Sequence, residues 1–405
     1  MDESVVVVGA GQAAAQLVAS LRSEGFAGPI TLIGEEAYIP YQRPPLSKAF
    51  LAGELAAERL FIKPEEFYPD AKCTLMLNTR ATSIDRARNV VKLEGGREVP
   101  YATLALTTGS RIRTLPLTGA DLPGCYYLRG IADVEKLQGL MKPGARLAII
   151  GAGYIGLEVA AVAAKRKLKV TILEALPRVM ARAACEPISA FYEQEHRNAG
   201  VDIRCNIKIE AIVKDGSALA VKTSAGDVPA DFILIGIGIL PNVELAAEAG
   251  LKVDNGILVD QFARTDDPAI YAIGDCTNHP CAYAASGRAR LESVQNAIDQ
   301  AKHAAAAICG KPKPYNEVPW FWSDQYDLKL QIAGLAQPTD AVVLRGDPAS
   351  RSFAAFRLRD GVIVAVEAVG AAPEYMMGRR LIAARARVAP DRLADKAVPM
   401  KEMSQ

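Results

Sequence analysis

The chain has 405 residues, half of them apolar, and a formal net charge of +1 at pH 7, so it is long enough for two or three domains. The near balance of basic and acidic residues argues against a nucleic-acid partner. No window reaches the roughly 18 uninterrupted apolar residues of a membrane span, and Asp2 and Glu3 stand where a signal peptide needs positive charge. We therefore expect a soluble, cytoplasmic protein with no membrane partner.

The N-terminal segment predicts a dinucleotide-binding Rossmann unit. An unbroken β-branched run at residues 5–8 is typical of a strand buried on both faces of a parallel sheet. It leads into Gly-Ala-Gly-Gln-Ala-Ala at 9–14, a helix-forming segment, and a second strand at 30–33 that ends just before Glu35. In such a turn the first glycine permits the bend, the second admits a pyrophosphate, and the third small residue lets helix and strand pack. The helix N-terminus then attracts the phosphates.

The same pattern recurs in the middle of the chain. A strand at 147–150 leads into Gly-Ala-Gly-Tyr-Ile-Gly at 151–156, a helix, and a strand that ends at Glu174. A carboxylate there binds the ribose 2′-hydroxyl of NADH and repels the 2′-phosphate of NADPH, so we expect NADH. Arg178 and Arg182 follow closely, and each either reaches a 2′-phosphate or lies in solvent at a helix start.

The seven cysteines are scattered, which is typical of reduced thiols in a reducing compartment. Cys276 and Cys281 have the C-x4-C spacing of the redox disulfide in glutathione-reductase-type flavoenzymes. There the pair follows the first Rossmann unit, and in this chain that region, residues 41–47, contains no cysteine. We expect structural thiols and not a dithiol relay.

Five segments carry a family resemblance: YQRPPLSK at 41–48, GAGYIGLE at 151–158, GIGILPN at 236–242, YAIGDC at 271–276 and PWFWSDQY at 319–326. Together they resemble the NADH-dependent ferredoxin reductases of bacterial oxygenase systems, the family of putidaredoxin reductase. The resemblance covers nearly the whole chain. It implies an α/β fold with two Rossmann-like dinucleotide-binding domains, in a glutathione-reductase-like flavoprotein architecture, and an α+β C-terminal domain. The implied domains are FAD-binding at 1–110 and 243–320, NAD-binding at 111–242, and C-terminal at 321–405.

For FAD, the resemblance assigns roles that the residue chemistry supports. Asp275 bonds ribitol hydroxyls or caps a following helix, and the two roles are compatible. Lys48 stabilises negative charge on the reduced ring or is a solvated helix lysine. Arg43 pairs with a phosphate or with a surface acid. Trp322 sits at the flavin edge or packs at a domain start. The expected FAD-contacting residues are Gly9, Gly11, Ala13, Ala14, Glu35, Arg43, Lys48, Ala81, Thr108, Gly109, Arg129, Asp275, Val294 and Trp322.

For NADH, the second glycine turn and its strand supply the expected contacts. Glu174 and Arg182 lie at the adenosine end, and Gly238 lets the backbone pass close to the cofactor. Glu158 approaches the nicotinamide end or is an ordinary exposed helix glutamate. The catalytic candidates are Lys48, Glu158 and Trp322, and the residues expected at the pyrophosphate are Gly151, Gly153, Ile155 and Gly156.

The implied function is transfer of a hydride from NADH to FAD, followed by single electrons to a [2Fe-2S] ferredoxin that serves a cytochrome P450 or a dioxygenase. Hydride transfer needs positioned cofactors, so we predict no metal and assign His196, His279 and His303 no role. We expect a monomer with a transient ferredoxin interface. The charges that could steer an acidic ferredoxin are Lys302, Lys311, Arg379 and Arg380.

Two alternatives stay open. The first is an FAD- and NADH-dependent reductase with another acceptor, such as rubredoxin, monodehydroascorbate or oxygen. The second is a protein resembling apoptosis-inducing factor, in which bound NADH drives dimerisation. That alternative favours a targeting segment, a long C-terminal insertion and a basic surface, and the sequence shows none of these.

Overall fold

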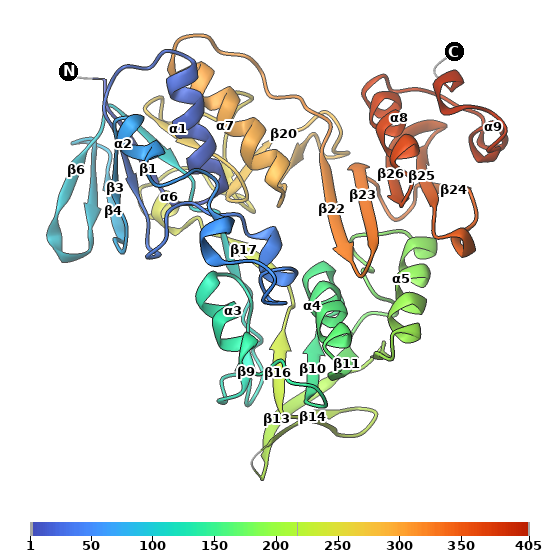
Figure 1. Ribbon diagram of the computed structural model, residues 1–405. Coiled ribbons are helices and arrows are strands. Elements are labelled where there is room, and N and C mark those ends of the chain that lie inside the picture. Colours follow the sequence, from blue (N-terminus) through green and yellow to red (C-terminus); the bar gives the residue numbers. More distant parts are fainter. Residues whose placement is uncertain (1–2, 217, 404–405) are drawn as a thin grey trace. The chain divides into compact units, whose positions relative to one another are not determined.

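The computed structural model describes residues 3–216 and 218–403, and its chain divides into two compact units (Figure 1). The chain passes between the units several times; one passage into the second unit lies in β8 (Ser110–Ile112), and the following return lies in β17 (Ile239–Pro241). Unit 1 comprises Met1–Gln42, Glu58–Arg111 and Leu240–Pro319, and unit 2 comprises Arg43–Ala57, Ile112–Ile239 and Trp320–Gln405.

Unit 1 is built on a parallel five-stranded sheet of order β19-β7-β1-β2-β3. Its central strand β1 (Val5–Val8) is buried along its whole length, as the unbroken β-branched run predicts. Helix α1 (Gln12–Ser23) follows it and packs against α7 (Val294–Ile308), as Figure 1 shows. The remaining strands are β2 (Ile30–Ile33), β3 (Cys73–Met76), β7 (Thr103–Leu106) and β19 (Ile270–Ala272).

Alternate residues of β1 enter two different cores. Val5 and Val7 join the cluster that contains α1 and α7, whereas Val6 and Val8 join a cluster with Val91. The strand period of two therefore places helices on one face of the sheet and a second sheet on the other. That second sheet is antiparallel and consists of β4 (Ala81–Asp85), β5 (Val90–Leu93) and β6 (Glu98–Pro100). The smaller elements of unit 1 are α2 (Phe67–Asp70), α6 (Glu244–Glu248), β18 (Ile257–Leu258), β20 (Thr277–Pro280), β21 (Arg288–Ala289) and a 3-10 turn at Glu94–Gly96.

Unit 2 repeats the parallel plan in an order β12-β11-β10-β16-β9. The apolar run at 232–240 predicts one buried strand, but the structure ends β16 at Ile235 because a glycine turn with Gly238 at φ +107° follows. The other elements are β9 (Cys125–Tyr126), β10 (Arg146–Ile150), β11 (Lys169–Leu173), β12 (Asp202–Arg204), β16 (Phe232–Ile235), α3 (Ile131–Gln138), α4 (Tyr154–Lys165), α5 (Glu186–Asn198), and an antiparallel sheet of β13 (Ile209–Asp215), β14 (Ala218–Thr223) and β15 (Val228–Ala230).

The C-terminal part of unit 2 is an antiparallel five-stranded sheet of order β22-β23-β26-β25-β24, against which α8 (Ala372–Ala383) packs. The predicted fold class, two Rossmann-like sheets and an α+β C-terminal part, is thus confirmed. None of the helices in the described part of the chain has the length and hydropathy of a membrane span. The bounds are β22 (Trp320–Gln325), β23 (Leu328–Gly334), β24 (Ala341–Arg345), β25 (Phe353–Arg359), β26 (Val362–Val369) and α9 (Pro390–Ala394), with 3-10 turns at Pro348–Ser350 and Met400–Glu402.

The segment Arg43–Ala57, which the expected boundaries place with the FAD domain, belongs to unit 2. It contains the 3-10 turn Pro44–Ser47, and a further 3-10 turn, Ala57–Leu60, follows at its end. Side chains of unit 2 bind its backbone: Gln138 donates to the Phe50 carbonyl at 2.5 Å and Arg166 to the Ala52 carbonyl at 3.5 Å. These contacts attach the segment to α3 and α4.

Candidate functional site

The first glycine turn, between β1 and α1, combines one constrained glycine with one open glycine. Gly9 has φ +109°, and a Cβ at this position would lie 2.3 Å from the Thr107 carbonyl oxygen. Gly11 is the N-cap of α1 in extended conformation, and a Cβ there would have no atom within 4 Å. The helix N–H groups at this end have no side-chain cap, so an anion can bind where the missing side chain would stand. The turn fits the pyrophosphate of a dinucleotide.

The second glycine turn repeats this arrangement in unit 2. Gly151 has φ +103°, with an added Cβ 2.4 Å from the Gly236 carbonyl oxygen, whereas Gly153 is the N-cap of α4 with open space around its Cβ position. A Cβ on Gly156 would lie 2.3 Å from the Gly151 carbonyl oxygen. The third glycine is therefore needed because α4 packs closely against the turn. Ile155 is 43% exposed, an uncovered apolar side chain beside the turn. This turn fits a second dinucleotide.

The two strand-end acids differ in their surroundings. Glu35 is exposed and lies 3.3 Å from Arg80. Glu174 is half-buried, and its carboxylate accepts hydrogen bonds from the Ala152 N–H at 2.7 Å and from the Leu176 N–H at 2.9 Å. Glu174 is therefore tied to the glycine turn itself, and its remaining lone pairs are available to ribose hydroxyls.

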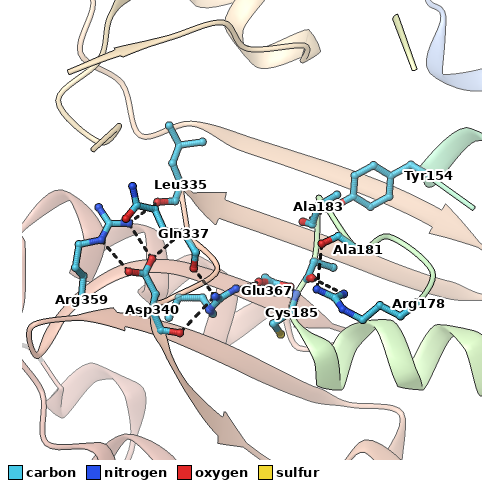
Figure 2. Close-up of polar contacts among 12 residues, drawn as sticks. Tyr154, Arg178, Ala181, Ala183, Cys185, Leu335, Gln337, Asp340, Arg359 and Glu367 are labelled. Atoms are coloured by element: carbon cyan, nitrogen blue, oxygen red, sulfur yellow. Dashed lines mark hydrogen bonds and ion pairs between the residues drawn. The ribbon is translucent and has the colours of Figure 1, made fainter. Parts of the chain in front are cut away.

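The loop after Glu174 contains the two arginines that left the cofactor choice open. Arg178 donates to the carbonyls of Ala184, at 2.8 Å, and Ala181, at 3.1 Å (Figure 2). Its guanidinium thus supports the loop, and it lies before the start of α5 at Glu186, so it is not a solvated residue of a helix start; its reach toward a 2′-phosphate stays a prediction. Arg182 is exposed. The role predicted for Arg182 at the adenosine end stays a prediction.

The far end of this loop is held by the C-terminal sheet. Glu367 of β26 accepts the Cys185 N–H at 2.8 Å, at the start of α5, as Figure 2 shows. Its other oxygen pairs with Arg357 at 3.2 Å, and both side chains are less than a tenth exposed. Burial, and then the charge of Glu367, raise the pKa of the Cys185 thiol to about 12. The carboxylate thus joins the C-terminal sheet to the Rossmann fold of unit 2.

Glu367→Ala is expected to lower the free energy of unfolding of unit 2 by about 3 kcal/mol, because it removes the ion-pair partner of the buried Arg357. Urea denaturation followed by far-UV circular dichroism measures the change. Glu210→Ala, which removes an exposed acid of the same unit, serves as the matched control and should change the free energy by less than about 0.5 kcal/mol. Equal stability of both variants would contradict the importance of the buried pair.

The remaining FAD candidates of unit 1 lie at loop and element ends. Asp275 accepts the Ser110 hydroxyl at 3.0 Å. Strand β20 follows it, so the predicted helix cap is wrong: the segment continues from the Gly274 turn into a strand. The Thr108 hydroxyl donates to the Asn242 carbonyl, and Gly109 has φ +61°. The other candidates are Ala13 and Ala14 in the first turn of α1, Ala81 at the start of β4 and Val294 at the start of α7.

Lys48 and Glu158 form a partly buried ion pair in unit 2. The Lys48 ammonium lies 2.7 Å from Oε2 of Glu158, whose side chain is 2% exposed. The same carboxylate accepts the hydroxyls of Ser47, at 2.5 Å, and Ser323, at 2.7 Å. Glu158 is therefore not an ordinary exposed glutamate, and Lys48 is not a solvated helix lysine.

Arg43, Arg129 and Trp322 also lie in unit 2. The Arg43 guanidinium donates to the Arg129 carbonyl at 2.6 Å. The ring of Trp322 lies 5.6 Å from that of Trp320, and the Arg379 guanidinium stands 5.6 Å from the Trp320 ring. These contacts hold the aromatic pair on one face of β22; the roles toward FAD stay predictions.

The surroundings of Cys276 and Cys281 oppose a dithiol relay, and two of the four candidate steering charges form ion pairs. All seven cysteines are free, and burial raises the pKa of both Cys276 and Cys281, which opposes the thiolate that a relay needs. Lys302 pairs with Asp299, Lys311 pairs with Glu24, and Arg380 is exposed.

Sequence reasoning missed four residues that the structure connects to Glu158: Ser47 and Ser323 bind it directly, and Gln325 and His196 are linked to it through Ser323. A signal was available for three of them, because Ser47 lies within the distinctive segment at 41–48 and the other two within that at 319–326. His196 lies on the amphipathic helix α5, where nothing in the local sequence marks it as different from a core residue.

Comparison with known proteins places this geometry in context. The family model described as "Pyridine nucleotide-disulphide oxidoreductase" matches residues 3–301, and that described as "Reductase C-terminal" matches residues 320–404. A ferredoxin–NAD(P)(+) reductase of Sphingomonas sp is 44% identical over 98% of this chain and 96% of its own. The rhodocoxin reductase of Rhodococcus erythropolis is also 44% identical, over 98% and 93%. The reductase in the covalent putidaredoxin reductase–putidaredoxin complex is 39% identical, with a TM-score of 0.94 over 99% of this chain and 98% of that one.

Proposed function

Because the chain belongs to the pyridine nucleotide-disulphide oxidoreductase family, we propose that it is an FAD-dependent NADH:ferredoxin reductase. The observation that carries this proposal is the pair of glycine-led helix N-termini, one on each parallel sheet, with open space at Gly11 and Gly153. Each offers uncapped N–H groups to a pyrophosphate. Two such turns provide for two dinucleotides, which matches the need of a flavoenzyme that oxidises a nicotinamide cofactor.

In this proposal FAD uses the turn of unit 1 and NADH the turn of unit 2. When bound, FAD supplies the conversion of one hydride from NADH into two single-electron transfers. The residues of the chain bind the two cofactors and orient them. Glu174 accepts the ribose hydroxyls and disfavours a 2′-phosphate, and Ile155 covers apolar cofactor surface. Glu158, paired with Lys48, stands at the nicotinamide end.

We propose a one-electron protein acceptor and not a disulfide. The segment that holds the redox cysteines in glutathione-reductase-type enzymes contains Ser47 here, and this serine is bound to Glu158. Two relatives are named for their small electron carriers, the rhodocoxin reductase and the reductase bound to putidaredoxin, which supports a ferredoxin as the partner. We further propose that the ferredoxin serves a P450 or a dioxygenase, and that the protein works in the cytosol, where its seven free thiols remain reduced.

The test is cytochrome c reduction by the purified, FAD-loaded protein with NADH. Three mixtures are compared, with a [2Fe-2S] ferredoxin, with a rubredoxin, and with no carrier. We expect rapid reduction only with the ferredoxin. Comparable rates with rubredoxin, or without a carrier, would overturn the acceptor, and a slow stoichiometric reaction accompanied by dimerisation would favour the NADH-responsive alternative.

A further inference from the structure

The carboxylate of Glu158 ends a buried chain of hydrogen bonds that crosses unit 2. The Ser323 hydroxyl is bound to Oε1 of Glu158 at 2.7 Å, and the Gln325 side-chain amide donates to the Ser323 oxygen at 3.2 Å. Ser323 is fully buried and Gln325 is 1% exposed. Because the amide N–H occupies the serine oxygen, the serine hydroxyl hydrogen is directed at the carboxylate.

The chain continues from Gln325 to the helix α5. His196, which is fully buried, places its Nε2 2.9 Å from the Gln325 amide oxygen and its Nδ1 2.9 Å from the Tyr326 hydroxyl. Burial lowers the pKa of His196 to about 4, so the ring is neutral near pH 7 and carries one proton. The amide oxygen only accepts, so that proton is on Nε2, and Nδ1 accepts the hydrogen of Tyr326.

Every hydrogen bond in this chain therefore points the same way, from Tyr326 through His196, Gln325 and Ser323 to Glu158. The opposite oxygen of the carboxylate accepts Ser47 and Lys48. An arrangement in which all neighbours donate fits the ionised carboxylate, because a protonated carboxyl would place a hydrogen against a donor.

The register of β22 creates the chain. Residues at positions 321, 323 and 325 alternate with the tryptophans and face α4 and α5. Phe321 packs on Tyr154, with ring centroids 4.8 Å apart, and Ser323 meets Glu158 four residues further along α4. Two residues of strand and one turn of helix advance by similar lengths, so both contacts form together.

We propose that Ser323, Gln325 and His196 are positioning residues that hold the ionised Glu158 in one orientation for the nicotinamide end of NADH. This inference rests on the proposed function, in which NADH occupies the turn at Gly153. The C-terminal sheet thus acts on the reaction through Glu158 without touching the reacting atoms. The rival explanation is a polar core that stabilises the fold alone.

Two ligands separate these explanations. ADP-ribose contains the pyrophosphate and adenosine but no nicotinamide, whereas 1,4,5,6-tetrahydro-NAD is an analogue with a reduced nicotinamide ring that does not donate a hydride. Affinity for both is measured on the FAD-loaded protein by titration calorimetry. If the residues position Glu158, their substitution changes the affinity for the analogue but not that for ADP-ribose. If their role is merely structural, substitution changes both affinities equally or neither.

The variants are Ser323→Ala, Gln325→Met and the conservative Ser323→Thr. We expect Ser323→Ala and Gln325→Met each to lower the affinity for the analogue about tenfold. The first removes a hydrogen bond to the Glu158 carboxylate, and the second removes the bond that orients the Ser323 hydroxyl toward it. The affinity for ADP-ribose should not change, and Ser323→Thr should restore the affinity for the analogue. Thr223→Val, which removes a buried hydroxyl bonded to the Gly226 carbonyl in the same unit, is the matched control and should alter neither ligand.

Stopped-flow reduction of the flavin gives a second readout. At saturating NADH, the rate should fall about tenfold in Ser323→Ala and recover in Ser323→Thr. Equal losses for both ligands, or wild-type behaviour of Ser323→Ala and Gln325→Met, would overturn the inference and leave the proposed function intact. A wild-type protein that binds neither ligand would instead overturn the proposed function, and the inference with it. If one of the two variants does not fold, the other gives the same discrimination.

Discussion

Gly153→Val is expected to fold like the wild-type chain and to lose NADH binding, whereas Gly151→Val is expected to destabilise unit 2. The two glycines stand two residues apart in one turn. Gly153 has an extended backbone that any residue adopts, and its Cβ position has no atom within 4 Å. Gly151 has φ +103°, and its Cβ position lies 2.4 Å from the Gly236 carbonyl oxygen.

The expected magnitudes follow from these two environments. At position 153, valine stands where the pyrophosphate approaches α4, so NADH affinity should fall by about a hundredfold or more. At position 151, a strained backbone and a collision with main chain should lower the free energy of unfolding by about 4 kcal/mol. Calorimetric titration with ADP-ribose and thermal unfolding measure the two quantities separately.

The same substitutions at Gly11 and Gly9 give a parallel control in unit 1. Gly11→Val should reduce the FAD content of the purified protein without changing its circular dichroism, whereas Gly9→Val should yield unstable protein. A Gly153→Val variant that binds ADP-ribose like the wild type would place the pyrophosphate elsewhere and remove the main support for the proposed NADH site.

Glu174→Ala is expected to lower the preference for NADH over NADPH, measured as the ratio of kcat/KM values, by about a hundredfold. The carboxylate accepts a ribose hydroxyl of NADH and repels a 2′-phosphate. Its removal also frees the Ala152 N–H, 2.7 Å away, which then becomes available as a phosphate donor. Arg182 is exposed on the following loop and supplies a positive charge.

Steady-state assays with both nucleotides, using ferricyanide as the acceptor, measure this ratio independently of any ferredoxin. Glu210→Ala removes one exposed negative charge of the same unit and controls for the change in net charge. Arg178→Ala should weaken the loop through its lost carbonyl bonds but leave the ratio unchanged. A preference that survives in Glu174→Ala would show that another residue sets the choice of cofactor.

Much of the fold and the positions of both glycine turns could be predicted from the sequence, because their causes are local. The β-branched run at Val5–Val8 and the glycines of each turn encode a buried strand, a bend and a helix start within about fifteen residues. The acid at Glu174 follows from the same local pattern. The strand end at Ile235 was not predicted, because an apolar run through a glycine turn looks continuous in sequence.

The burial and the hydrogen-bond partners of the side chains around the second turn were decided only by the tertiary structure. Ser47, Ser323 and Glu158 are more than one hundred residues apart in sequence, and their meeting depends on how β22 and the segment Arg43–Ala57 pack on α4. The same holds for Arg178, whose use as a loop brace depends on carbonyl directions that residue type does not specify. The sequence alone determined the positions of the two glycine turns, each between a buried strand and a helix. The long-range packing determined that Glu158 is buried and surrounded by hydrogen-bond donors, because burial and hydrogen-bond direction are properties of assembled elements.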